Sequence, residues 1–217
     1  MKATGLALGL LLAFSLSAFA APPTVSISFS ATAVVVTDVP PGHDILVFGI
    51  AKEPSQYFTT QVQRERILSP APGEHSVTWD IGKTIARRSV WCAVDLRTGD
   101  FDVKAPPSGV LSRMTDGPSF LRDESGGLAS IVHQRADAVV LLVTPGRGVW
   151  RLRSGDGDSI DQDPAVARTR MPFTRFVSSD KNGPPPPKKL TSNDVIIVID
   201  PLYLDVWSGK IGQEVQP

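Results

Sequence analysis

Four aspartates lie close together between residues 154 and 163, in a segment that also contains glycine. These candidate metal ligands are Asp156, Asp158, Asp161 and Asp163. Carboxylate oxygens on a glycine-containing loop are what Ca²⁺ requires, so Ca²⁺ is the one cofactor that the sequence indicates. The spacing departs from the EF-hand pattern, because the glycine at the sixth loop position and the glutamate at the twelfth are missing. The alternative is a loop that is solvated or paired with nearby arginines, namely Arg147, Arg151, Arg153, Arg168 and Arg170.

Three further aspartates, Asp95, Asp100 and Asp102, lie at a predicted hairpin whose loop is the Arg-Thr-Gly-Asp sequence of residues 97–100. Two facing carboxyl groups are the catalytic apparatus of most glycoside hydrolases. Turns also collect Asp and Gly for conformational reasons alone. Both interpretations, a hydrolytic pair and ordinary turn residues, therefore remain open.

The other reactive side chains are isolated. His43, His75 and His133 lie far apart, without the short spacing of a zinc-binding motif. Cys92 is the single cysteine, so no internal disulfide forms. Its apolar neighbours indicate a small buried hydrophobic residue, with a thiol nucleophile or an intermolecular bridge as alternatives. The sequence has no nucleophile elbow, P-loop or dinucleotide-binding glycine motif, although a Ser-His-Asp triad can assemble across a fold.

The elements that must position these residues are centred on residues 138–153. Residues 139–143 are continuously apolar, 144–148 contain Pro and Gly, and 149–153 alternate, which predicts a hairpin. Alternation places Trp150 and Leu152 on one face of the second arm.

A second fully apolar run covers residues 195–199. Because exposed edge strands of this composition promote aggregation, we expect both apolar runs in the middle of one sheet, as neighbours or near neighbours. Leu141 or Leu142 and Ile197 should then be buried.

The first half alternates between apolar and polar residues, for example at Val25, Ile27 and Phe29. About seven short strands separated by turn signals are expected before residue 104, a pattern typical of an antiparallel β-sandwich with immunoglobulin-like architecture. We therefore predict a mainly β protein with a β-sandwich domain at residues 21–103.

Residues 104–118 are rich in Pro, Gly and Ser and are the predicted linker. Residues 119–217 are predicted to form a second β-rich domain with hairpins and at most one or two short helices. Asp163-Pro164 is a typical helix start, and Met171-Pro172 would end that helix. Residues 181–189 include four consecutive prolines and predict an extended polyproline II loop.

The N-terminus predicts export. Lys2, an apolar stretch over residues 6–16 and Ala18-Phe19-Ala20 form the pattern of a signal peptide, removed after residue 20. The expected location is therefore secreted or periplasmic, with no membrane span in the mature chain. The formal net charge of zero gives no general attraction to nucleic acid or anionic membranes, so we expect no nucleic-acid partner.

Two functions are compatible with these observations. The first is a non-catalytic β-sandwich protein with a binding or structural role, whose partner is an unidentified protein or glycan. The alternative is an extracytoplasmic hydrolase that uses carboxylates. A cleft with two facing acids of perturbed pKa would favour the hydrolase, whereas shallow grooves would favour the binding protein.

Overall fold

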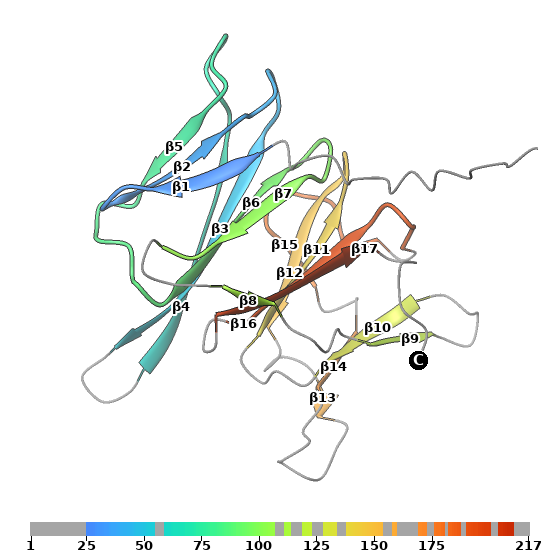
Figure 1. The fold of residues 1–217 in the computed structure, drawn as a ribbon. Helices are drawn as coiled ribbons and strands as arrows, with labels where there is room; N and C mark the ends of the chain where they lie inside the picture. Colours follow the sequence, from blue (N-terminus) through green and yellow to red (C-terminus); the bar gives the residue numbers. More distant parts are fainter. Residues whose placement is uncertain are drawn as a thin grey trace, which may run out of the picture.

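The described part of the chain consists of β-strands and connecting loops (Figure 1). The computed structural model describes residues 25–54, 59–106, 111–113, 119–122, 128–133, 138–153, 158–159, 169–172, 176–180, 182–187, 190–200 and 204–210. No helix in these ranges is long and apolar enough to cross a membrane. The mainly β prediction is thus confirmed for this part of the chain.

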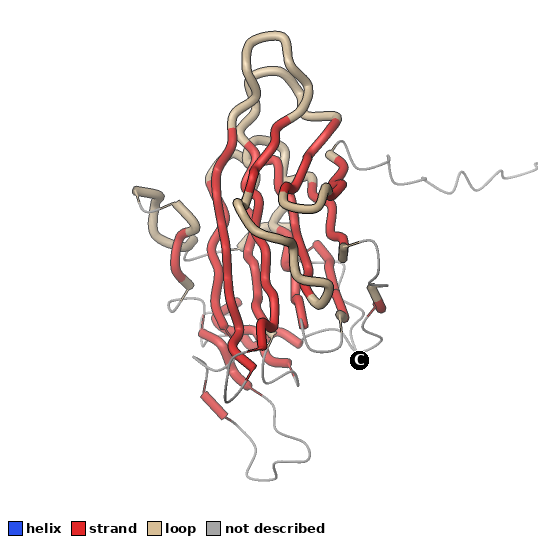
Figure 2. The backbone as a smooth tube through the Cα atoms, turned by 90° about the vertical axis from the view of Figure 1, so that its left-hand side faces the viewer, coloured by secondary structure: helices blue, strands red, loops and turns tan. Residues whose placement is uncertain are grey.

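The described residues up to Lys104 form two antiparallel sheets with seven strands, in agreement with the prediction of about seven. Sheet A has the order β1 (Ser26–Phe29), β2 (Ala33–Thr37), β5 (Val77–Asp80). Sheet B has the order β4 (Thr59–Leu68), β3 (Ile45–Pro54), β6 (Ser89–Asp95), β7 (Phe101–Lys104). The tube in Figure 2 shows the long strands running side by side, with several loops gathered at one end.

The second half contributes two more sheets. Sheet C has the order β15 (Val177–Ser178), β12 (Gly148–Arg153), β11 (Val139–Thr144), β16 (Val195–Asp200), β17 (Asp205–Lys210), β8 (Ser112–Arg113). It is antiparallel except for the parallel pair β17 and β8. Sheet D is antiparallel, with the order β13 (Asp158–Ser159), β14 (Thr169–Pro172), β10 (Leu128–His133), β9 (Ser119–Arg122).

The prediction of a helix after Asp163-Pro164 is wrong for the C-terminal end of that helix. Residues 169–172 form strand β14, whose backbone pairs with both β10 and β13. This pairing with residues distant in sequence overrides the local helix signal. The predicted helix start lies outside the described residues.

Sheet B contributes its alternate side chains to two hydrophobic cores. Ile45 and Val47 pack with sheet A, whereas Leu46 and Phe48 pack with sheet C. The A–B core contains the buried residues Val25, Ile27, Val34, Val36, Val39, Ile45, Val47, Val77, Ile85, Trp91 and Ala93. The period-2 pattern of β3 therefore places sheet B between the other two sheets.

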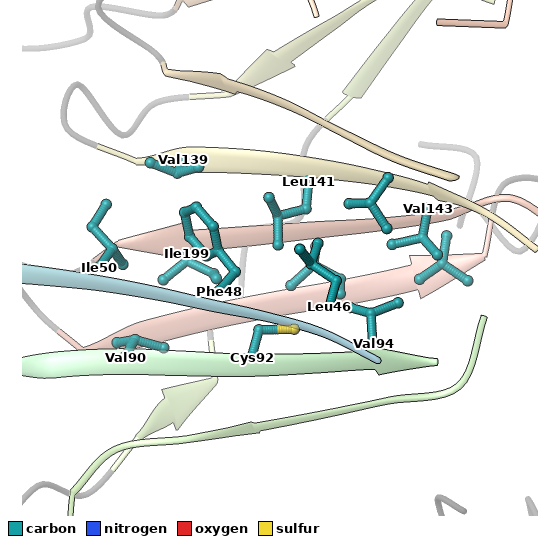
Figure 3. Packing of buried hydrophobic residues seen from close by; sticks show 13 residues of the cluster. Leu46, Phe48, Ile50, Val90, Cys92, Val94, Val139, Leu141, Val143 and Ile199 are labelled. Carbon is teal, nitrogen blue, oxygen red and sulfur yellow. The ribbon is translucent and has the colours of Figure 1, made fainter. Parts of the chain in front are cut away.

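The core between sheets B and C joins residues from the two halves of the chain (Figure 3). This B–C core contains Leu46, Phe48, Ile50, Val90, Cys92, Val94, Val139, Leu141, Val143, Val149, Val195, Ile197 and Ile199. The predicted linker contains strand β8, which extends sheet C. The division of the chain into two domains stays a prediction.

The two most apolar strands, β11 and β16, are neighbours in the middle of sheet C, as predicted. Leu141 lies opposite Ile197 in the ladder, and both side chains are fully buried in the B–C core. The predicted alternation in β12 is also confirmed, because Trp150 and Leu152 face away from that core. The Trp150 indole donates to the carbonyl of Pro184 at 2.9 Å, which holds the proline-containing loop to this outer face.

Candidate functional site

The acidic segment lies mostly outside the described residues, which include only Asp158 of its four aspartates. The backbone of Asp158 begins β13, opposite Arg170 of β14. Among the described residues, no group of three His, Cys, Asp or Glu side chains could hold a metal ion. Ca²⁺ binding at Asp156, Asp158, Asp161 and Asp163 thus stays a prediction.

Arg151 is not available to neutralise the acidic segment. Its guanidinium forms a bidentate ion pair with Glu65, with N–O distances of 2.9 and 3.0 Å. A third nitrogen donates to the side-chain oxygen of Gln63 at 3.0 Å. These contacts connect β12 of sheet C to β4 of sheet B and close part of the interface between the two sheets.

Asp95 organises the turn at the end of sheet B. It is fully buried, and its Oδ2 lies 2.7 Å from Nδ1 of His43. Its Oδ1 accepts hydrogen bonds from the backbone N–H groups of Arg97 and Thr98. Burial by itself would raise the pKa of Asp95, but the hydrogen bond from His43 and the two backbone N–H groups outweigh it and lower that pKa. Asp95 is therefore a structural carboxylate held in its ionised form.

Asp102 also has a structural partner. Its Oδ2 accepts a hydrogen bond from the backbone N–H of Ile27 at 2.8 Å and lies 3.1 Å from Nζ of Lys104. The backbone carbonyl of Asp100 accepts from the amide of Asp95, which closes the hairpin. The carboxyl groups of Asp95 and Asp102 are thus engaged in bonds that shape the fold.

Cys92 and His75, two other candidates for catalysis, also take part in the packing and hydrogen bonding of the fold. Cys92 is fully buried in the B–C core, as predicted, and burial together with the nearby charge of Asp102 raises the pKa of its thiol. Nδ1 of His75 lies 3.2 Å from the carbonyl oxygen of Val39. Ser69 donates to a carboxylate oxygen of Asp44. Within the described residues, the hydrogen-bond partner of the His43 ring is Asp95, and the hydrogen bonds described there include no hydroxyl or thiol that would complete a catalytic triad.

An open groove of about 150 Å³ lies between the edges of sheets B and C. Its lining residues are Leu46, Ile67, Leu96, Gly146, Arg147, Gly148, Val149, Ser178, Ser179, Asp180, Gly183 and Pro184. Leu46 and Val149 also belong to the B–C core, so the groove is an open continuation of that core. This volume is enough for one compact apolar side chain.

Among the residues whose side chains the structure describes, two large hydrophobic ones are exposed, one in the lining of this groove and one next to a lining residue. Ile67 of β4 is 36% exposed and lines the groove, and Val177 of β15 is 59% exposed and precedes the lining residue Ser178. The ladders place them on the inward faces of their sheets, since Ile67 lies opposite Leu46 and Val177 lies opposite Arg151. Single exposed hydrophobic residues are ordinary, but one in the lining of a groove and a second next to that lining are consistent with a contact surface.

Backbone contacts fix the walls of the groove. The amide of Gly146 donates to the carbonyl of Leu96 at 2.9 Å, which joins the β11–β12 turn to the β6–β7 turn. Gly99 allows this approach, because a Cβ there would lie 2.6 Å from the ring of Pro145. On the other wall, the amide of Ser179 donates to the carbonyl of Val149 at 2.9 Å. The groove is therefore largely preformed.

Sequence reasoning did not identify this groove. Its lining comes from β3, β4, β12, β15 and the segments that follow β6, β11 and β15, and no local pattern connects these segments. No protein-family model matches the chain, and no curated protein matches it in sequence.

Proposed function

We propose that this chain is a secreted or periplasmic, non-catalytic β-sandwich protein that binds a protein partner at the groove between sheets B and C. The observation that carries the proposal is a preformed groove that has the exposed Ile67 in its lining and the exposed Val177 next to the lining residue Ser178. Leu46, Val149 and the exposed Ile67 give the groove apolar contact area of the kind found at the centre of protein interfaces, beside the polar lining residues Arg147, Ser178, Ser179 and Asp180. A protein is therefore preferred over a glycan as the partner.

The hydrolase alternative has less support. A glycoside hydrolase needs one carboxylic acid with a raised pKa to protonate the leaving group. The pKa of Asp95 is shifted in the opposite direction, and Asp102 holds a backbone amide of sheet A. Neither carboxyl group lines the groove.

The proposal also includes the immunoglobulin-like architecture of the first half and the export of the protein. The packing of sheets A and B around the A–B core supports an immunoglobulin-like sandwich in the first half. The signal-peptide pattern of residues 1–20, which lie outside the described part of the chain, supports export. N-terminal sequencing of the exported protein should find Ala21 first.

Site-specific photo-crosslinking in the cells that produce the protein tests the binding function. p-Benzoylphenylalanine replaces Val177 in one variant and Thr78, which is exposed on β5, in the control. Irradiation should give a defined product of higher mass from position 177 and none from position 78. Adding Ile67→Glu should abolish the product from position 177. Equal products from both positions, or a product that Ile67→Glu leaves unchanged, would contradict binding at the groove.

A further inference from the structure

We infer that Asn182, in the turn that leads into the proline-containing loop, is a site of spontaneous deamidation. The side-chain amide is replaced by a carboxylate, and water is the only co-reactant. Asn182 is exposed, and the next residue, Gly183, lines the groove. This reaction goes beyond the proposed binding function and does not depend on it.

Two adjacent residues of the turn supply the reacting atoms. The backbone nitrogen of Gly183 attacks Cγ of the Asn182 side chain, and the new bond closes a cyclic imide, a succinimide. The bond between Cγ and the side-chain nitrogen breaks, and that nitrogen leaves as ammonia with the proton of the backbone amide. Water then opens the ring at one of its two carbonyl groups, which leaves aspartate or isoaspartate at position 182. No oxidant or reductant takes part.

The packing of the turn favours glycine directly after Asn182. A Cβ on residue 183 would collide with Oγ of Ser178 and would lie 3.0 Å from the backbone oxygen of Asp180. A side chain on the residue that follows an asparagine hinders the attack on Cγ, whereas glycine leaves its backbone nitrogen accessible and its backbone free to rotate. The close packing of this turn therefore places the most reactive type of neighbour after Asn182.

The hydrogen bonds of this turn hold its backbone. Oδ1 of Asp180 accepts from the amide of Asn182 at 3.0 Å, and the carbonyl of Asp180 accepts from the amide of Gly183 at 2.9 Å. Within the described part of the chain, the hydrogen bonds of Asn182 involve its backbone and not its side chain. Attack on Cγ thus requires the bond from Gly183 to open, and a turn at the surface opens at a low cost in free energy.

The chain has two asparagines, and the second, Asn193, lies exposed in a turn with the same backbone hydrogen bonds. Oγ1 of Thr191 accepts from the amide of Asn193 at 3.3 Å, and the carbonyl of Thr191 accepts from the amide of Asp194 at 3.0 Å. Asp194 is buried, and its carboxylate accepts a further hydrogen bond from the amide of Thr191. This bond and the buried side chain keep the second turn closed, so Asn193 should be protected.

Deamidation of Asn182 changes the charge beside the groove. The product carries a carboxylate two positions after Asp180, which lines the groove and is exposed. Isoaspartate also adds a methylene group to the main chain ahead of Pro184, whose carbonyl accepts the hydrogen bond from the Trp150 indole. The reaction thus alters the wall of the groove that the proline-containing loop forms.

Mass spectrometry of the full-length exported protein, incubated at neutral and at mildly alkaline pH, tests this inference. Trypsin cleaves between the two asparagines, so each is measured on its own peptide. The Asn182 peptide should gain one mass unit and separate by chromatography into an aspartate and an isoaspartate form. Its unmodified form should disappear at least about tenfold faster than that of the Asn193 peptide. The rate should rise with pH, because base removes the proton from the attacking nitrogen.

Two variants and an unfolded sample serve as controls. Asn182→Gln should abolish the mass change of its peptide, and Gly183→Ala should slow it at least about tenfold. Circular dichroism should show that both variants keep the β-sheet spectrum. The wild-type protein in concentrated urea gives the rate at Asn182 without the turn. The comparison of Asn182 with Asn193 in the wild type does not require either variant to fold.

An Asn182 peptide that stays unmodified in the native protein but deamidates in urea would show that the turn blocks the attack, and this result would overturn the inference. Absence of deamidation in both states, equal rates at Asn182 and Asn193, or an unchanged rate in Gly183→Ala would overturn it as well. Crosslinking from position 177 is measured separately, so the proposed binding function stands or fails independently of these results.

Discussion

The backbone N–H of Ile27 in β1 donates to Oδ2 of Asp102 in β7 at 2.8 Å. A side chain of sheet B therefore accepts the hydrogen bond of a backbone N–H on an edge strand of sheet A. Nζ of Lys104 completes the arrangement by donating to the carbonyl oxygen of Ile27, also at 2.8 Å. Both outward backbone groups of Ile27 are therefore bound. This contact covers an edge that would otherwise be open to pairing with other chains.

Removal of the Asp102 carboxylate should loosen β1. Asp102→Ala leaves the amide of Ile27 without its acceptor, and we expect a loss of about 1–3 kcal/mol in the free energy of unfolding. Asp102→Asn retains an acceptor oxygen and should cost less. Urea unfolding of both variants, with amide exchange at Ile27 measured by NMR, checks this prediction. Unchanged exchange at Ile27 in Asp102→Ala would show that the bond does not hold the strand.

Asp95 should make stability depend on pH in the acidic range. Its pKa in the folded protein is below the ordinary value of 3.8, so the unfolded chain takes up the proton first as pH falls. The stabilisation is fully present above about pH 5 and is lost as pH falls below about pH 4 through the folded-state pKa. Asp95→Asn should therefore be less stable than wild type near neutral pH, and the difference should narrow in acid.

Urea unfolding at a series of pH values measures this difference. Asp180→Asn, at an exposed position, makes the same change of charge as a control. A gap between Asp95→Asn and wild type that stays constant down to about pH 3 would mean that Asp95 is not held ionised by its partners.

The strands were predictable from the sequence because their signals are local. Alternation identified the inward-facing Ile27 of β1 and the buried Val25 just before this strand, and the continuous apolar runs identified β11 and β16 as central neighbours. Burial on one face requires period 2, and burial on both faces requires an uninterrupted apolar run. The same local reasoning failed at residues 169–172, where pairing with distant strands decides the conformation.

The candidate site could not be predicted because its contacts join distant positions. The groove brings Leu46 and Ile67 of the first half of the chain together with Val149 and Ser178 of the second half. Each of these residues has an ordinary sequence context, such as a turn or an alternating strand. Their neighbours depend on how the sheets are arranged in space, and local sequence patterns do not reveal that arrangement.

The ion pair between Arg151 and Glu65 should contribute measurably to stability. Its side chains are 30% and 26% exposed, and the bidentate geometry favours a larger effect than that of a typical surface pair. A double-mutant cycle with Arg151→Ala and Glu65→Ala should give a coupling free energy of about 1 kcal/mol. Arg151→Lys keeps the charge but loses the bidentate geometry, so it should recover only part of the coupling. A coupling within error of zero would contradict a role for the pair in joining the sheets.

Asp158 gives a test of the Ca²⁺ hypothesis. In the presence of a chelator, Asp158→Ala should change the free energy of unfolding by less than about 0.5 kcal/mol. If the acidic segment binds Ca²⁺, the ion will raise the melting temperature of the wild type, and Asp158→Ala will lose that rise. Thermal melts of both proteins, with Ca²⁺ and with chelator, measure the effect. An identical response of the two proteins to Ca²⁺ would exclude Asp158 as a ligand.

The most direct test of the account is whether the two halves of the chain share the B–C core that forms the groove. Ile197 of the second half and Cys92 of the first half are both fully buried in this core. Ile197→Ala should cost about 2–5 kcal/mol, whereas Val177→Ala, at a position that is 59% exposed, should cost little.

The measurement is the urea concentration at which Cys92 begins to react with a thiol reagent. The native wild-type protein should be unreactive, because the thiol is buried and its pKa is raised. If the two halves share the core, Ile197→Ala should lower the urea concentration at which Cys92 is labelled. This decrease should equal the decrease in the urea concentration at which the β-sheet signal is lost. Labelling of Cys92 at the wild-type urea concentration, despite the destabilised second half, would contradict a shared core.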